Sequence, residues 1–336
     1  MRVALLTHEA FPDEAKTAVG LLRYGDHEVR AVVDREFAGR RVADVLDGVQ
    51  DAPVVASMDD VPEVDALIIG IAPIGGRFEE SWRPDVRAAL ERGCDVVSGL
   101  HDFLADDPEF ADLAAEHGGQ LRDLRRPPDD LTVAEGTAGG VDATVVTTVG
   151  TDCSTGKMTV SFELRDAARE RGLDAAVVPT GQTGVAITGW GLSVDRVVAD
   201  YAAGAVERLV QTPEEKDLLI VEGQGSIVHP AYSGVTTSIL HGSAPDALVL
   251  CHEAGRGTIN GYESFSIPPL PAVVDLYDRL AAPVSDATVV AGALNTRHLD
   301  DGAAEQAVAG YAEAIDAPAC DPVRNGVADE VLDAVV

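Results

Sequence analysis

Lysine is almost missing from this sequence. Only Lys16, Lys157 and Lys216 occur, so arginine supplies the other 22 of the 25 basic residues, against 57 acidic residues and a formal net charge of −32 at pH 7. The acidic residues are spread along the whole chain, a pattern typical of a solvated acidic surface. Such a surface repels nucleic acid and anionic membranes, so we expect neither as a partner and a small molecule as the substrate. A salt-loving (halophilic) host explains the charge, because concentrated ions screen the self-repulsion.

Long apolar runs and paired cysteines are missing too. No apolar stretch reaches the roughly 18 to 20 residues needed to span a bilayer, and residues 1–6 lead into polar residues, unlike a signal-peptide core. The four cysteines, Cys94, Cys153, Cys251 and Cys320, lie far apart without a Cys-x-x-Cys pair. That spacing supplies neither a disulfide framework nor a zinc signature. We therefore expect a cytoplasmic protein with reduced thiols; the sequence leaves open whether it forms a homo-oligomer.

The first third of the chain alternates short apolar runs with segments of helical spacing. Strands are predicted at residues 3–7, 29–34, 66–72 and 95–98, helices at 13–24, 42–46, 81–92 and 101–117, and a short last strand at 120–123. This alternation predicts a parallel, doubly wound sheet. Residues 1–126 are thus expected to form a Rossmann-like N-terminal domain, followed by a linker at 127–141 that is rich in proline and small residues.

The same pattern begins again after the linker. Strands are predicted at residues 143–149, 175–178, 218–221, 247–251 and 288–293, and helices at 157–171, 194–209, 273–280 and 303–315. Parallel strands require helical crossovers of this kind. Residues 142–336 are therefore expected to form a second α/β domain.

A glycine-bounded loop joins the first strand and the first helix of this second domain. It reads Gly150-Thr151-Asp152-Cys153-Ser154-Thr155-Gly156-Lys157 and contains one of the three lysines. Backbone N–H groups, the helix N-terminus and the lysine charge together suit a phosphate, although five residues separate the glycines where the usual P-loop has four. A tight turn with an incidental lysine is the alternative. We predict that residues 150–159 bind the phosphates of a cofactor.

The residue after the lysine is irregular. Met158 stands where the usual loop has a Ser or Thr whose hydroxyl binds Mg²⁺, and a thioether is a poor ligand for that hard cation. Thr159 is one residue further, which turns it by about 100° around the helix. We therefore expect a phosphate site without the standard metal.

Polar residues follow the other predicted strands of this domain. Glu222 ends an apolar strand, where open α/β sheets bind ligands, and could accept a proton, orient a metal-bound water or stabilise a turn. His229 is an acid/base candidate and Tyr232 a substrate-binding candidate in the same loop, with a structural histidine as the alternative. Gln182 and Thr183 lie in a glycine-rich turn after another strand and are substrate-binding candidates, since its glycines and hydroxyls suit close approach to a ligand; a plain turn is the alternative. Arg256, near a later strand end, is able to bind a substrate carboxylate or phosphate.

Two glycine-rich turns of the first domain, with Arg77 and His101, lack a Gly-x-Gly-x-x-Gly fingerprint. We interpret them as loops that face a small ligand or the other domain, with surface roles as the alternative for both side chains.

The loop 150–157 and Val221-Glu222-Gly223 resemble dethiobiotin synthetase and its P-loop relatives. A second resemblance covers nearly the whole chain: it is to a two-domain family that joins a Rossmann-like N-terminal domain to a dethiobiotin-synthetase-like P-loop domain and includes D-glutamate N-acetyltransferases. The segments that carry it are Ile69-Gly70-Ile71-Ala72-Pro73-Ile74-Gly75-Gly76, Ser98-Gly99-Leu100-His101-Asp102-Phe103, Gly150 to Thr159, Gly181-Gln182-Thr183-Gly184, Glu222-Gly223-Gln224-Gly225-Ser226, His229-Pro230-Ala231-Tyr232 and Asp321-Pro322-Val323-Arg324.

This resemblance implies transfer of acetyl from acetyl-CoA to the amino group of D-glutamate or a similar amino acid. The loop with Lys157 would bind the CoA phosphates, Glu222 or His229 would take the proton of the amine, and Arg256 or Arg324 would pair with a substrate carboxylate. Two positions differ from the synthetase. Met158 stands at its metal-binding threonine position, and this chain lacks the lysine that precedes the proline corresponding to Pro179. The alternatives are a ligase or kinase that uses ATP with Mg²⁺, and a nucleotide-sensing protein without catalysis.

Overall fold

The structure of the protein, a computed structural model, describes residues 1–71, 76–213 and 215–336. The chain divides into two compact units. Met1–Pro128 and Gln182–Arg196 form the first unit; Asp129–Gly181 and Val197–Val336 form the second. The sequence boundaries at 1–126, 127–141 and 142–336 stay a prediction, but the structure packs residues 182–196, which we expected in the second domain, with the first unit. Residues 72–75 of the motif at 69–76 lie outside the described residues.

The first unit is built on a parallel sheet. Among the described residues its strands are β1 (Arg2–Leu6), β2 (Glu28–Val33), β3 (Val54–Val55), β4 (Ala66–Ile69), β5 (Asp95–Ser98) and β6 (Leu121–Asp123). Their spatial order is β3-β2-β1-β4-β5-β6, which is the order of the Rossmann fold. β4 is buried along its whole length, as expected for an apolar strand of a sheet covered on both faces.

Two predicted helices of this unit are shorter than expected. The segment 42–46 forms only a 3₁₀ turn, Val42–Asp44. The helix expected from residue 101 begins at Pro108, because the Asp107 carboxylate accepts the backbone N–H groups of Glu109 and Phe110 and proline fits the first helical turn. The α-helices in the described part of the unit are α1 (Lys16–Tyr24), α2 (Arg83–Glu91), α3 (Pro108–His117) and α5 (Gln182–Thr188).

The second unit contains another parallel sheet. In the part of the chain that the structure describes, its strands are β7 (Thr144–Gly150), β8 (Ala175–Val178), β9 (Leu218–Val221), β10 (Ala247–Glu253), β13 (Val289–Asn295) and β14 (Ala319–Cys320). The order is β14-β13-β10-β7-β9-β8, so β7 lies between β10 and β9. A small antiparallel pair, β11 (Thr258–Ile259) and β12 (Tyr262–Ser266), follows β10.

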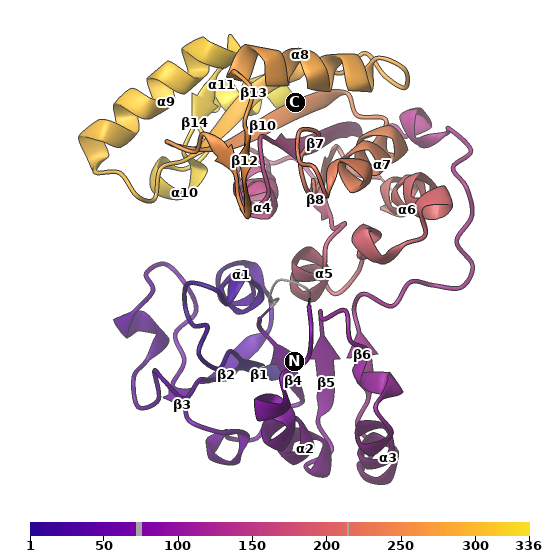
Figure 1. Cartoon of the computed structure of the whole chain (residues 1–336), viewed down its shortest axis with the longest axis vertical. Helices are drawn as coiled ribbons and strands as arrows, with labels where there is room; N and C mark the ends of the chain where they lie inside the picture. Colours follow the sequence, from indigo (N-terminus) through magenta and orange to yellow (C-terminus); the bar gives the residue numbers. More distant parts are fainter. Residues whose placement is uncertain (72–75, 214) are drawn as a thin grey trace. The chain divides into compact units, whose positions relative to one another are not determined.

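Helices cover both faces of this sheet (Figure 1). α4 (Lys157–Glu170) and α11 (Asp329–Val335) pack on the face that Val249 and Cys251 line; α7 (Ser233–Ser243), α8 (Leu270–Ala281) and α9 (Asp301–Ile315) pack on the face lined by Leu248 and Leu250. The alternation of neighbouring residues between two cores follows from the two-residue period of a strand. α6 (Ala199–Gln211) packs against α7, and the short α10 (Pro322–Asn325) follows β14.

The expected two-domain α/β fold, Rossmann-like and then P-loop-like, is confirmed. The sequence prediction missed α7, whose glycines and β-branched residues have low helix propensity. Tertiary packing stabilises it: a Cβ on Gly242 would lie 2.4 Å from the backbone oxygen of Ala203 in α6, so only glycine permits this approach. None of the helices described is both long and apolar enough to cross a membrane.

Candidate functional site

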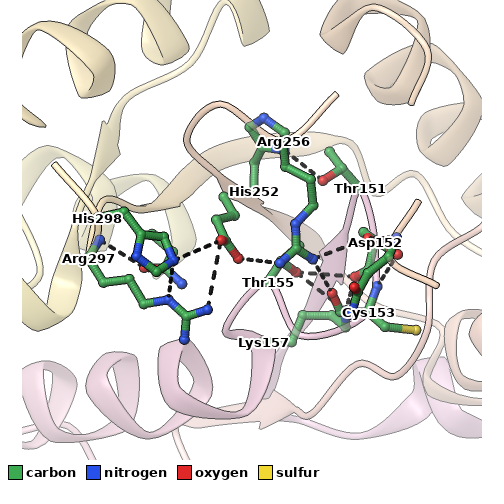
Figure 2. Close-up of polar contacts among 12 residues, drawn as sticks. Thr151, Asp152, Cys153, Thr155, Lys157, His252, Arg256, Arg297 and His298 are labelled. Carbon is green, nitrogen blue, oxygen red and sulfur yellow. Dashed lines mark hydrogen bonds and ion pairs between the residues drawn. The ribbon is translucent and has the colours of Figure 1, made fainter. Parts of the chain in front are cut away.

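The glycine-bounded loop turns from β7 into α4 and encloses its own lysine. The Lys157 side chain is 6% exposed, and its ammonium donates a hydrogen bond to the backbone oxygen of Asp152 at 2.7 Å (Figure 2). A Cβ on Gly150 would lie 2.8 Å from both the Lys157 ammonium and the Thr155 hydroxyl and 3.1 Å from the Asp152 backbone oxygen, so a side chain there would displace the lysine from its place in the loop. Gly156 has a φ of 101°, a conformation that side chains rarely adopt, which explains the second glycine.

This loop has the chemistry of an anion site. α4 begins at Lys157, directly after Gly156 at the N-cap, which has no side chain to cap the helix. The first N–H groups of a helix have no partners within the helix and carry its positive end. Together with the buried ammonium they fit a phosphate or diphosphate. Met158 is buried in the first turn of α4, so this position offers no hydroxyl to a metal ion.

Asp152 fixes the loop to the segment that follows β10. Its carboxylate is fully buried and accepts hydrogen bonds from Arg256 Nη1 at 3.1 Å, the Asn260 backbone N–H at 2.8 Å and the Cys153 backbone N–H at 2.7 Å. Arg256 also donates to the Cys153 backbone oxygen at 2.8 Å and pairs with Glu253 at the end of β10. The predicted substrate arginine therefore supports the phosphate loop.

His252 lies on the same side of the loop. Its Nδ1 is 2.7 Å from the Thr151 hydroxyl, and its ring stacks on Tyr311 with centroids 5.8 Å apart. Burial lowers the pKa of His252 to about 4, and the charge of Arg256 acts in the same direction. His252 is therefore neutral at neutral pH. The sequence prediction gave it no role, although it is the second-last residue of β10, four positions before Arg256.

Glu222 directly follows β9, which flanks β7 on the side opposite to β10 and His252. Its carboxylate is buried and accepts a hydrogen bond from the Gly181 backbone N–H at 3.2 Å. The next residue, Gly223, packs directly on β7: its N–H donates to the Thr148 hydroxyl at 3.0 Å, and a Cβ on it would lie 1.7 Å from the Thr148 backbone oxygen and 3.2 Å from Lys157 Cδ. Glu222 is thus held beside the phosphate loop, as predicted for a carboxylate at a strand end.

His229 is buried in the loop after β9 and is a poor base in this arrangement. Its Nδ1 accepts the backbone N–H of Ala231 at 3.0 Å, so in the neutral ring the proton is on Nε2. Burial lowers the pKa of His229; the charge of Asp152 opposes this shift, and that of Lys157 adds to it. The ring contacts Tyr232, with centroids 4.6 Å apart. The Nδ1 lone pair of His229 is therefore already used within its own loop.

Three groups around the loop could together coordinate a metal ion. Ligand atoms of Asp152, Cys153 and His229 all lie within 4.8 Å of one another. However, the carboxylate of Asp152 already pairs with Arg256, whose positive charge opposes a second cation. The expectation of a site without metal stays a prediction.

The other predicted substrate residues have separate surroundings. Gln182 and Thr183 belong to the first unit, where the Thr183 hydroxyl lies 2.8 Å from that of Thr17 in α1. Arg324, in α10, donates to Thr296 Oγ1 at 3.1 Å and to the Leu299 backbone oxygen at 2.7 Å, and so supports the loop after β13.

One supporting residue gave no signal in the sequence. The fully buried Tyr277 of α8 donates to the Gly150 backbone oxygen at 2.7 Å and accepts the Ile227 backbone N–H at 3.1 Å. Burial raises its pKa to about 12, so the hydroxyl remains a donor. Tyr277 thereby connects the start of the phosphate loop to the loop after β9.

Comparison with known proteins matches both units. The family model described as "Domain of unknown function (DUF1611_C) P-loop domain" matches residues 132–332, and "Domain of unknown function (DUF1611_N) Rossmann-like domain" matches residues 35–127. A protein of Tritonibacter scottomollicae named D-glutamate N-acetyltransferase is 38% identical over 274 residues, which cover 80% of each chain. A Pseudoalteromonas protein of the same name is 36% identical over 262 residues, 78% of each chain. The crystal structure of a DUF1611 family protein from Anabaena variabilis is similar with a TM-score of 0.94 and 40% identity, over 99% of this chain and 98% of that one.

Proposed function

This chain belongs to the two-domain DUF1611 family, and we propose that it is an N-acetyltransferase that moves the acetyl group of acetyl-CoA to the amino group of D-glutamate. Two relatives that match most of its length carry the name D-glutamate N-acetyltransferase. The phosphate loop with its buried lysine suits the diphosphate of CoA. Both observations favour a reaction of small molecules at the carboxyl edge of the second sheet.

The observation that carries the proposal is Met158. A loop built for phosphates, with a buried thioether where the metal-binding hydroxyl of the usual loop stands, suits a ligand that is bound and not hydrolysed. Phosphoryl transfer uses metal ions that bridge the phosphates. Attack of an amine on a thioester requires no such ion.

The chemical step needs a proton acceptor and a path for the leaving group. Glu222 takes a proton from the ammonium group of the amino acid, and the free amine then attacks the thioester carbonyl carbon. The C–N bond forms and the C–S bond breaks; the nitrogen then loses its second proton, which neutralises the thiolate of the departing CoA. Tyr232, in the loop after β9 of the same unit, is a proposed substrate contact. A substrate carboxylate could pair with Arg256 only if Arg256 released Asp152. It could pair with Arg324 only if Arg324 released Asp301.

The first test is which ligand stabilises the protein. Thermal unfolding is followed in high KCl with CoA, acetyl-CoA or ATP, each with and without Mg²⁺, since a ligand that binds the folded state raises the unfolding temperature. Acetyl-CoA should stabilise the protein without Mg²⁺, and addition of D-glutamate should then release free CoA thiol in the presence of EDTA. Folded protein that releases no CoA with D-glutamate or with a panel of other D- and L-amino acids would remove the acetyltransferase. Stabilisation by ATP that depends strictly on Mg²⁺ would favour the ligase or kinase.

A further inference from the structure

Charge is distributed unevenly along the carboxyl edge of the second unit's sheet. β10 and β13 lie on one side of β7, and β9 lies on the other. The end of β10 and the loops after β10 and β13 carry Arg256, Arg297 and His298 together with Glu253 and Asp300, whereas the loop after β9 carries Glu222 and His229 and no arginine. In a chain with a formal charge of −32, a group of basic side chains beside a phosphate loop indicates an anionic ligand on that side.

Glu253, the last residue of β10, connects these basic side chains. Its Oε2 pairs with Arg256, and its Oε1 lies 3.4 Å from His298 Nε2 and 3.8 Å from the Arg297 guanidinium. Figure 2 labels these three partners. Glu253 is opposite Asn295 in the register of β10 and β13, which brings the residues after β13 to it. One carboxylate therefore connects the two arginines, and the His298 imidazole, whose Nε2 accepts a hydrogen bond from Arg297 Nε, lies beside them.

Arg297 and His298 are open to a further partner. Their side chains are 61% and 64% exposed, whereas Arg256 is mostly buried against the loop. Arg297 Nε donates to His298 Nε2 at 2.9 Å, which holds the two side chains together. The 3.8 Å between Arg297 Nη2 and Glu253 is an ion pair without a hydrogen bond, so the pair leaves guanidinium donors for another anion. A phosphate is well suited, because a guanidinium can donate two parallel hydrogen bonds to it.

We propose that Arg297 and His298 bind the phosphate on the 3′ carbon of the CoA ribose, an assignment that rests on the proposed function. CoA carries this third phosphate one ribose away from its diphosphate. Contacts run without a break from the loop through Arg256 and Glu253 to Arg297. The adenosine end of CoA therefore lies over β10 and β13. The acetylated end lies on the side of Glu222, where the amine loses its proton.

The test compares CoA with 3′-dephospho-CoA, which lacks only that phosphate. Binding of both is measured calorimetrically at the lowest KCl concentration that keeps the protein folded, because salt screens exposed charges. The parent should bind CoA about tenfold more tightly than dephospho-CoA, as expected for a charge-assisted contact on an exposed surface. Arg297→Gln should reduce this ratio to about twofold and leave the affinity for dephospho-CoA unchanged. Combining it with His298→Gln should bring the ratio close to one.

Arg279→Gln is the matched control, since Arg279 is an exposed arginine of α8 that pairs with Asp275 one turn away. It removes the same charge and should leave the ratio unchanged. Equal binding of CoA and dephospho-CoA by the parent would overturn the assignment, and so would an Arg279→Gln ratio as low as that of Arg297→Gln. Binding of neither compound by the folded parent would overturn the proposed function itself.

Discussion

Replacing Gly223 by alanine should damage the second unit at the phosphate loop. A Cβ there would lie 1.7 Å from the Thr148 backbone oxygen, whereas real Cβ atoms essentially never approach another heavy atom within 3.0 Å. The obstacle is the backbone of β7, so the end of β9 must move away from β7 by more than an ångström or so, and strain of this kind costs about 3 kcal/mol or more. The same Cβ would lie 3.2 Å from Lys157 Cδ, so the displacement also disturbs the lysine.

The assay is equilibrium unfolding by urea in high KCl, with acetyl-CoA binding measured in parallel. Gly310→Ala is the control, because Gly310 is exposed in α9 and a Cβ there meets nothing within 4 Å. That change should stabilise the protein by roughly 0.5–1 kcal/mol, the difference in helix propensity. A Gly223→Ala protein whose free energy of unfolding stays within about 0.5 kcal/mol of the parent and which binds acetyl-CoA normally would refute the packing of β9 against β7 described above.

Three further outcomes are expected. Glu222→Gln should lower kcat by about 10²- to 10⁴-fold with little change in acetyl-CoA affinity, since it keeps the shape but removes the base; steady-state kinetics within a few-fold of the parent would assign Glu222 to structure. Lys157→Ala should weaken CoA binding, whereas Met158→Thr should leave turnover nearly unchanged, because the reaction needs no metal ligand there; a calorimetric titration and a CoA-release assay measure the two. The pKa of His252 is 6.5 in the unfolded chain and about 4 in the folded protein, so the folded state favours the neutral ring. The contribution of His252 to the free energy of unfolding is therefore fully present above pH 6.5 and is lost as the pH falls toward 4. That contribution is at most about 3 kcal/mol, and urea unfolding of His252→Asn should show a correspondingly weaker pH dependence.

The parts of the fold that follow from local pattern were predictable. Apolar runs such as Ala247–Glu253 and the glycines around Lys157 locate strands and the phosphate loop, because their chemistry is contiguous in the sequence. α7 was not predictable, since packing on α6 stabilises it against its own low propensity. The position of residues 182–196 in the first unit also depends on tertiary contacts, among them the one between Thr17 and Thr183.

In the candidate site, too, the residues marked by local sequence pattern were predictable, and those brought in by tertiary contacts were not. The loop residues and Glu222 were predicted to lie near one another because they stand at strand ends, and the structure places them side by side. Asn260 and Tyr277 reach the loop through a backbone N–H and a helix side chain from distant segments, and no motif signals such contacts. The partner of Arg256 could not be predicted either. A basic residue near a strand end predicts an anionic partner, but only the structure shows that Asp152 is one such partner.

Transfer of a labelled acetyl group tests the central claim. The folded protein is incubated in high KCl with EDTA, without ATP, with D-glutamate and acetyl-CoA that carries isotope in its acetyl group, and the products are quantified by mass spectrometry. The account predicts labelled N-acetyl-D-glutamate in a one-to-one ratio with free CoA, at a rate that Lys157→Ala lowers at subsaturating acetyl-CoA. Product that carries no label, or that forms only with ATP and Mg²⁺ while nucleoside diphosphate accumulates in step, would contradict it.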